Sequence, residues 1–235
     1  MAFDLAKYKI ETRQYSVRTG PIRFGLAVSG LEYFLWHRVL RPLWSHCYWR
    51  HPRLPAAQSF QPKHVENCRV FADRWEILRS LSKGKIWAEV GTYEGAFARD
   101  IIDICEPSQI DLIDISLDPL KKRGLVHETG TVAFHAGDSA DSLLAQPDNK
   151  YDYIYIDASH DLIDVARDAE AATRKLKPGG LIIFNDYTCF SLGEMRPYGV
   201  VLVVNSLVAS GTWEVACFAF QPNMYCDIAL RRVPD

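Results

Sequence analysis

Short strand-like and helix-like stretches alternate from residue 85 to the end of the chain. A connection between parallel strands has to cross over one face of the sheet, usually as a helix, and such sheets are buried on both faces. The pattern therefore predicts an α/β fold: a Rossmann-like, doubly wound, mostly parallel seven-stranded sheet that ends in an antiparallel hairpin. The predicted strands are 85–90, 109–115, 131–135, 151–156, 181–184, 213–220 and 225–233, and the predicted helices are 95–105, 118–128, 138–145 and 161–176.

Residues 198–209 are ambiguous, because their valine-rich sequence has strand propensity. The alternation of the fold requires a helix here, and Val200, Val203, Val204 and Leu207 follow helical spacing. We therefore predict a helix.

Charge divides the chain into two parts. Residues 1–64 hold 10 Lys and Arg against 3 Asp and Glu, whereas residues 65–235 hold 17 against 26. A basic N-terminal extension, for which we also expect helical structure, thus precedes an acidic domain at 65–235. A nucleic-acid partner is not expected, because the basic excess is not on the predicted domain.

The extension is rich in aromatic residues between positions 21 and 50, with arginines set among them. No run is long and apolar enough to span a bilayer. Two interpretations stay open. The segment forms a lid on the domain or a homodimer contact, or it lies in a membrane interface with its arginines extended outward. Residues 51–63, with three prolines, are predicted to be a linker.

The six cysteines are scattered and include no C-x-x-C pair, which favours a reducing compartment. The N-terminus shows no charged and then apolar signal-peptide pattern. We expect a cytoplasmic protein, with membrane association through residues 21–50 as the open alternative.

The segment from Glu89 to Gly95 (EVGTYEG) reads as the end of a buried strand followed by a glycine turn into a helix. Gly91 would let the backbone approach a nucleotide-like ligand, and Gly95 would let the next helix pack on the strand. The G-x-x-x-G spacing departs from the G-x-G-x-x-G of dinucleotide binders and argues against a nicotinamide-dependent oxidoreductase.

Ligands of open α/β sheets lie beyond the carboxyl ends of the strands. Asp114 lies at the end of the second predicted strand, where a carboxylate can accept hydrogen bonds from a ribose diol. Asp138 and Ser139 follow the third strand, where Asp138 is equally well explained as a helix N-cap. The fourth and fifth strands lead to Asp157–Asp161 and to Asn185–Tyr187.

Together, the 89–95 turn, Asp114, Gly137-Asp138, YIDASH at 155–160 and LKPGGLIIFNDY at 176–187 resemble a class I S-adenosylmethionine-dependent methyltransferase. Within that class they are most similar to small-molecule O-methyltransferases of the macrocin and catechol types. The resemblance covers residues 65–233 and implies methyl transfer to a hydroxyl of a small acceptor.

The resemblance also implies which residues bind the cofactor. Asp114 with Ile115 would bind the ribose side, Asp138 and Ser139 would lie near adenine, and Asp157 would close the site. The turn beside the methionine would comprise Glu89, Gly91, Thr92, Tyr93 and Gly95. Some relatives hold a divalent cation such as Mg²⁺ at this edge, and Asp157, Asn185 and Asp186 match its ligand positions; oxygen ligands suit such an ion.

His160 is the candidate general base, since imidazole titrates near neutral pH and follows Asp157 in a loop at the crevice. Asp157 would either orient His160 or bind metal. A non-catalytic protein on a degenerate methyltransferase fold is the alternative from another class, and the retained acids and His160 argue against it.

Overall fold

The computed structural model describes residues 35, 38, 56–194 and 196–233. The chain divides into two units, Met1–Arg53 and Leu54–Asp235, and all elements below belong to the second. The predictions for residues 21–50 fall, apart from two positions, outside the described residues. Within the described part, no helix has the length and apolar character to cross a membrane.

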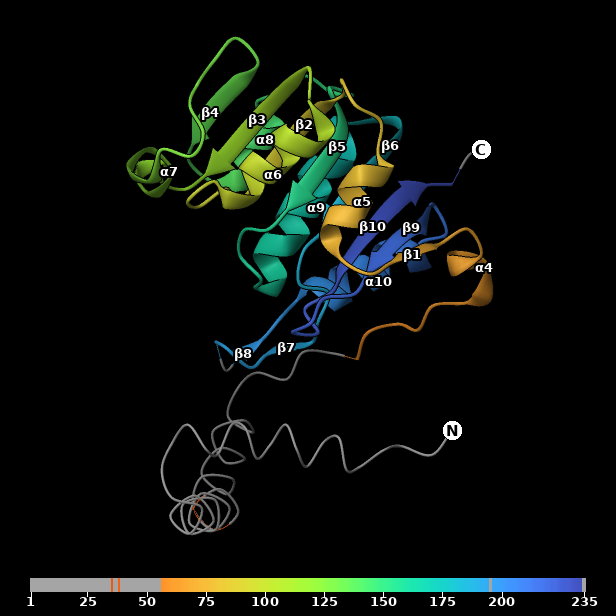
Figure 1. Cartoon of the computed structure of the whole chain (residues 1–235). Coiled ribbons are helices and arrows are strands. Elements are labelled where there is room, and N and C mark those ends of the chain that lie inside the picture. Colours follow the sequence, from red (N-terminus) through yellow and green to blue (C-terminus); the bar gives the residue numbers. More distant parts are fainter. Residues whose placement is uncertain (1–34, 36–37, 39–55, 195, 234–235) are drawn as a thin grey trace, which may run out of the picture. The chain divides into compact units, whose positions relative to one another are not determined.

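A twisted sheet forms the centre of this unit (Figure 1). Its described strands run in the order β1-β9-β10-β6-β5-β2-β3-β4, and all pair in parallel except β10, which is antiparallel to both neighbours. The doubly wound sheet and the C-terminal antiparallel pair are thus confirmed. The strands are β1 (Arg69–Phe71), β2 (Ile86–Val90), β3 (Gln109–Asp114), β4 (Val132–Ala136), β5 (Tyr151–Ile156), β6 (Leu176–Phe184), β9 (Trp213–Ala219) and β10 (Asp227–Arg232).

Helices cover both faces of the sheet, and each face has its own apolar core. Val165, Ala169 and Val204 pack in one core, and Ile77, Ile101 and Leu120 in the other. Residues 200–209 form a helix, as the fold alternation predicts. The described helices of this unit are α4 (Pro62–Val65), α5 (Arg74–Ser80), α6 (Ala96–Cys105), α7 (Asp118–Arg123), α8 (Ser139–Leu144), α9 (Leu162–Lys175) and α10 (Val200–Ala209).

The structure differs from the sequence prediction at several element boundaries. The sheet gains β1 as an eighth strand, and α4 and α5 were not predicted. Helix α7 ends at Arg123 and not near 128, because Gly124 adopts a left-handed conformation with φ of 64° and caps it. Strand β6 begins at Leu176, five residues earlier than predicted, with a register shift opposite β5.

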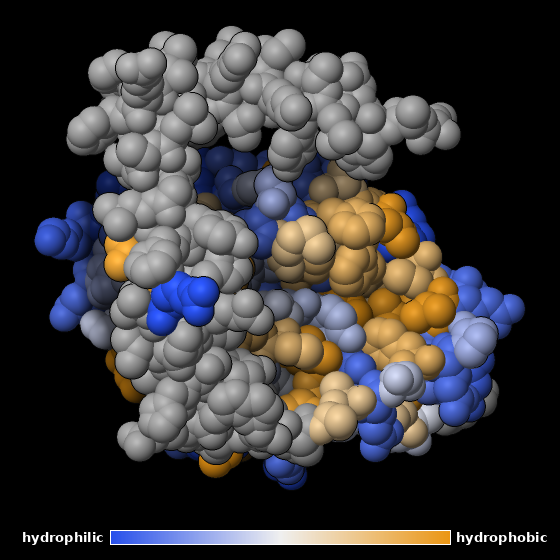
Figure 2. Space-filling view, turned by 90° about the horizontal axis from the view of Figure 1, so that it is seen from below, coloured by the Kyte–Doolittle hydropathy of each residue, from blue (hydrophilic) through white to orange (hydrophobic). Residues whose placement is uncertain are grey.

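The carboxyl ends of the parallel strands meet at one edge of the sheet. The segment after β6 adds a small antiparallel pair there, β7 (Phe190–Ser191) and β8 (Arg196–Pro197). Seen from this end, apolar and hydrophilic surfaces lie side by side (Figure 2). Exposed apolar side chains at the strand ends include Ile115, Leu192 and Met224.

Candidate active site

A cavity of about 340 Å³ opens at the ends of β2, β3, β4 and β5. It brings together most of the residues predicted to bind the cofactor, although they are far apart in the sequence. Glu89, Thr92 and Gly95 are not part of its wall. The predicted residues that line it are Gly91, Tyr93, Asp114, Ile115, Asp138, Ser139 and Asp157.

The glycine turn is built for packing between backbones. Gly91 has φ of +90°, and a Cβ there would lie 2.0 Å from the carbonyl oxygen of Asp157. Gly95, the N-cap of α6, has φ of +79°, and its Cβ would lie 2.3 Å from Cδ1 of Leu120 in α7. Gly91 thus approaches the backbone of the loop after β5 as well as lining the cavity, and the close neighbour of Gly95 is α7 and not the strand.

Asp114 holds the glycine turn in place. Its carboxylate accepts hydrogen bonds from the backbone N–H groups of Tyr93 (2.7 Å) and Ser116 (3.1 Å). The adjacent side chains of Tyr93 and Ile115 line the cavity although they are 66% and 82% exposed. The Asp114 carboxylate lies between the exposed side chains of Tyr93 and Ile115. This arrangement is suitable for a ribose whose base lies against Ile115.

Glu89 and Thr92 lie behind the turn. Both are buried, and Glu89 Oε2 and Thr92 Oγ1 have no hydrogen-bond partner within the described residues. Burial raises the pKa of Glu89 well above its usual range, and the nearby Thr92 hydroxyl offsets this only in part. Glu89 thus supports the turn from beneath and does not face the cavity.

Asp138 is the N-cap of α8, in agreement with one of the two interpretations of the sequence. It accepts from the backbone N–H of Asp141 (3.1 Å) and forms two bonds with Arg167 of α9, at 2.9 and 3.1 Å. The neighbouring Ser139 hydroxyl donates to Asp168 of α9 at 2.5 Å. Arg167 and Asp168 line the cavity and were missed. The available signal was Asp168 itself, an acid on the apolar face of an amphipathic helix beside Val165 and Ala169.

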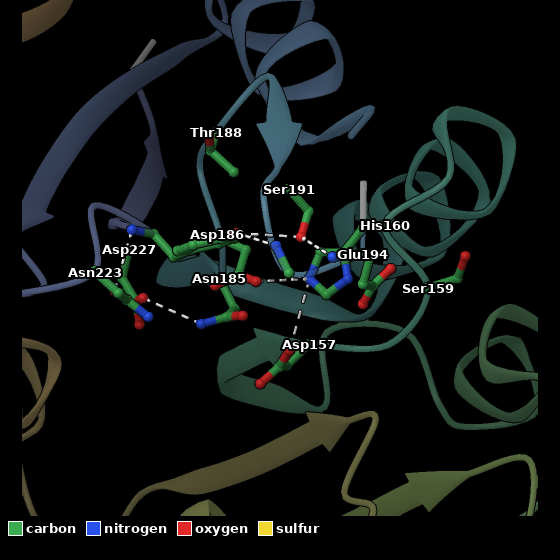
Figure 3. Close-up of polar contacts among 12 residues, drawn as sticks. Asp157, Ser159, His160, Asn185, Asp186, Thr188, Ser191, Glu194, Asn223 and Asp227 are labelled. Atoms are coloured by element: carbon green, nitrogen blue, oxygen red, sulfur yellow. Dashed lines mark hydrogen bonds and ion pairs between the residues drawn. The ribbon is translucent and has the colours of Figure 1, made fainter. Parts of the chain in front are cut away.

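His160 lies between two carboxylates at the ends of β5 and β6. Its Nε2 is 3.7 Å from Oδ1 of Asp157 and 3.7 Å from Oδ2 of Asp186 (Figure 3). The imidazole stacks on Tyr198, with ring centroids 4.3 Å apart, and the backbone N–H of Gly199 donates to the His160 carbonyl at 2.7 Å. Three loops therefore fix the ring.

Burial controls the titration of this group. It lowers the pKa of His160 below 6.5, so the imidazole is neutral at pH 7. Burial and the charge of Asp186 raise the pKa of Asp157 to about 8, and burial raises that of Asp186 to about 6. Asp186 also takes up a left-handed backbone conformation, with φ of 53°, directly after β6.

Asn185 belongs to a buried network beside these residues. Its amide nitrogen donates to Oδ1 of Asp227 (3.2 Å) and to the Tyr155 hydroxyl (3.3 Å), and Figure 3 shows this nitrogen turned toward Asp227. Asp227 also accepts from Tyr155 at 2.7 Å, and Arg74 lies 3.5 Å away. Sequence reasoning missed Arg74 and Asp227, because no local motif marks the starts of α5 and β10.

The predicted metal ligands Asp157, Asn185 and Asp186 stay a prediction. The Asn185 amide nitrogen donates to Asp227, so its oxygen is the atom left for a cation, and the His160 imidazole lies between Asp157 and Asp186. Throughout the part of the chain that the structure describes, no group of three His, Cys, Asp or Glu side chains is arranged to hold a metal ion. We therefore assign no step to a metal.

Comparison with known proteins now adds to this geometry. Residues 88–187 match the family model described as a methyltransferase domain. The similarity to that family covers 100 of the 235 residues. The match covers the glycine turn, the cavity and the Asp157–Asp186 edge.

Solved structures agree with the fold. An S-adenosylmethionine-dependent methyltransferase from Mesorhizobium loti superposes with a TM-score of 0.52 and 18% identity, over 67% of this chain and 97% of that one. The N-methyltransferase NodS from Bradyrhizobium japonicum in complex with S-adenosyl-l-homocysteine gives 0.48 and 17%, over 69% and 86%. At 18% identity the first of these structures shows a shared fold, and no specific substrate follows.

A curated relative is spermine synthase from Arabidopsis thaliana, 27% identical over 125 residues. The match covers 51% of this chain and only 33% of that protein. The chain thus spans about a third of the length of this relative. These comparisons show the fold, and both the cofactor and the acceptor have to be argued from the site.

Proposed function

We propose that the domain transfers the methyl group of S-adenosylmethionine to a hydroxyl group of a small molecule, with His160 as the general base. The observation that carries the proposal is the position of His160 Nε2, between Asp157 and Asp186 and without a hydrogen-bond partner within the described residues. A neutral imidazole with an unused nitrogen can accept a proton from a hydroxyl placed beside it.

The chemistry asks little covalent help from the protein. The sulfonium of S-adenosylmethionine supplies an activated methyl group, so the site has to align the acceptor and remove its proton. The acceptor oxygen bonds to the methyl carbon while the carbon–sulfur bond breaks and leaves its electron pair on sulfur. The hydroxyl proton passes to His160 Nε2, where the Asp186 carboxylate, whose pKa of about 6 leaves it mainly ionised at pH 7, stabilises the imidazolium.

Asp157 supports the proposal because it connects the cofactor cavity with the surroundings of His160. It lines the cofactor cavity and also lies beside His160. A base 3.7 Å from a residue of that wall is within reach of an acceptor at the mouth of the cavity. Since Tyr198 stacks on the imidazole and Gly199 holds the His160 backbone carbonyl, the base is positioned before the acceptor binds.

The test uses the full chain, labelled S-adenosylmethionine and a panel of phenols, catechols and sugars, each paired with an amine of matched shape. We expect transfer to hydroxyl members only, and a 10²- to 10⁴-fold lower kcat in His160→Gln, the usual share of general-base catalysis. His127→Gln, at an exposed position, is the matched control and should keep full activity.

Two outcomes would overturn the proposal: transfer confined to amines, or an undiminished kcat in His160→Gln. Calorimetric titrations with S-adenosylhomocysteine and with NAD separate the donor from the acceptor question. Binding of NAD alone would favour the oxidoreductase interpretation. Loss of activity in EDTA with recovery in Mg²⁺ would restore the metal to the mechanism.

A further inference from the structure

Among the described residues, no hydrogen bond holds the reactive nitrogen of His160. Its Nε2 lies 3.7 Å from a carboxylate oxygen of Asp157 and 3.7 Å from one of Asp186. A face of the imidazole is covered by Tyr198, whose ring stacks on it with a centroid distance of 4.3 Å and an interplanar angle of 9°. The orientation of the base therefore depends on how firmly Tyr198 is held against it.

The ring of Tyr198 has a second neighbour, Arg196 of β8. The guanidinium carbon Cζ of Arg196 lies 5.3 Å from the centre of the Tyr198 ring. A guanidinium at such a distance is attracted by the negative face of an aromatic ring. Because Tyr198 is only 3% exposed, little water competes with either contact.

Two ion pairs fix the guanidinium of Arg196. Its Nη1 donates to Oδ1 of Asp161 at 2.7 Å, and its Nε donates to Oε2 of Glu194 at 2.5 Å. Asp161 directly follows His160 in the chain and is the N-cap of α9, but its side chain makes no capping hydrogen bond. The Asp161 carboxylate is thus used to bind Arg196, which ties β8 to the residue beside the base.

We propose that Arg196 is a positioning residue for His160: it holds Tyr198 against the imidazole and so keeps Nε2 facing the two carboxylates. The proposal rests on His160 as the base named under the proposed function, although the position of the ring can be tested without catalysis. A cation–π contact and partly exposed ion pairs are each weak, so the effect should be smaller than that of removing the base.

The first experiment observes the His160 ring by NMR in the full chain with ¹³C-labelled histidine. A ring stacked on tyrosine has proton resonances shifted by the ring current. Among the seven histidines, the signal that is missing in His160→Gln identifies this residue. In Arg196→Met the signal should move toward the position of an unstacked histidine, and in Arg196→Lys, which keeps the charge, it should move less. Arg79→Met removes an exposed ion pair on α5, with Glu76 at 2.6 Å, and should leave the signal unchanged.

The second experiment measures kcat and KM with the hydroxyl acceptor that turns over in the panel above. Arg196→Met should lower kcat about 3- to 30-fold, which is less than the 10²- to 10⁴-fold expected for His160→Gln. The KM for S-adenosylmethionine should not change, and Arg196→Lys should recover part of kcat.

Asp161→Asn tests the other end of the ion pair, since asparagine is as good an N-cap as aspartate. This variant should lose less activity than Arg196→Met and should shift the His160 signal in the same direction. The double variant should be no slower than Arg196→Met, because both changes break the same bond. Asp161→Asn also carries the test if Arg196→Met does not fold.

An unmoved His160 signal in a folded Arg196→Met would overturn the proposal, whether or not the chain methylates a hydroxyl. An undiminished kcat in Arg196→Met, with a slow His160→Gln, would also overturn it. A lowered kcat with an unmoved signal would mean that Arg196 acts on the acceptor and not through the ring. Full activity in His160→Gln would remove the proposed base, while a moved signal would still show that Arg196 holds the imidazole.

Discussion

The proposed site has a donor side, around Asp114 and Asp138, and an acceptor side, around Asp157, His160 and Asp186. The carboxyl groups of the two sides are held in different ways. On the donor side, Asp114 and Asp138 are satisfied by backbone N–H groups and, for Asp138, by Arg167, which lowers the pKa of its carboxyl. On the acceptor side, Asp157 and Asp186 lie near each other in a buried place, and burial raises both pKa values.

This difference separates a binding surface from a reactive one. Fully bonded carboxylates hold a rigid shape and cost little to keep ionised. Carboxyl groups that are buried near one another resist ionisation. A positive charge between them stabilises their ionised form. His160 lies between them and would carry that charge while methyl transfer takes its proton. Under the proposed function, the donor side would hold the cofactor, and the acceptor side would stabilise the positive charge that forms on His160.

The two sides meet at Gly91, so Gly91→Ala should give the largest loss of stability. Its Cβ would strike the Asp157 carbonyl at 2.0 Å, and the residue also has φ of +90°. We expect a loss of at least about 3 kcal/mol of stability, which adds a backbone shift to the 1–2 kcal/mol cost of a left-handed residue. Urea unfolding measures it.

Gly84→Ala is the matched control for that change. Gly84 also has a positive φ, +70°, but its Cβ would meet nothing within 4 Å. It should lose only about 1–2 kcal/mol, the cost of the conformation alone. Equal losses at the two glycines would show that the approach of the turn to the β5 loop carries no weight.

Asp114→Asn should affect the donor side alone. The amide keeps an acceptor for one backbone N–H but loses the charge that strengthens bonds to ribose hydroxyls. A bond to a charged group contributes about 1.5–3 kcal/mol, which corresponds to a 10- to 100-fold weaker binding of S-adenosylhomocysteine. Calorimetry on this variant and on His160→Gln sharpens the comparison, because the latter should bind the compound as the wild type does. Weaker binding of S-adenosylhomocysteine in both variants would mean that the two sides do not act separately.

How far the sequence predicts this site depends on how local the contacts are. Asp114, Asp138 and His160 each follow a strand whose pattern is clear, so their place at the carboxyl edge could be predicted. Arg74 and Asp227 begin elements that are distant in the sequence, and only the tertiary fold brings them to Tyr155.

Even where a residue was placed correctly, the contacts that constrain it could not be predicted from the sequence. Gly91 was identified as a turn residue, yet its constraint is the Asp157 backbone, which lies 66 residues further along the chain. Asn185 was placed at the correct edge, but the bond from its amide nitrogen to Asp227 could not be predicted. Strand ends can be read from periodicity, whereas side-chain partners across the edge cannot.

The acceptor side can be tested separately by the pH-dependent gain in stability expected from Asp157→Asn. The folded-state pKa of Asp157 is raised to about 8, far above the usual value for an unfolded chain, so its stabilising contribution is complete at low pH and is lost as pH rises through 8. The melting temperature of the variant relative to wild type should therefore increase between pH 5 and pH 8.5, by about 2–4 °C for each kcal/mol of charge burial removed. Calorimetric melts at the two pH values measure this, with Asp118→Asn, an exposed aspartate, as the control whose difference should not change with pH. A pH-independent difference in Asp157→Asn would mean that Asp157 is ionised without cost, and the acceptor side would then be as well satisfied as the donor side.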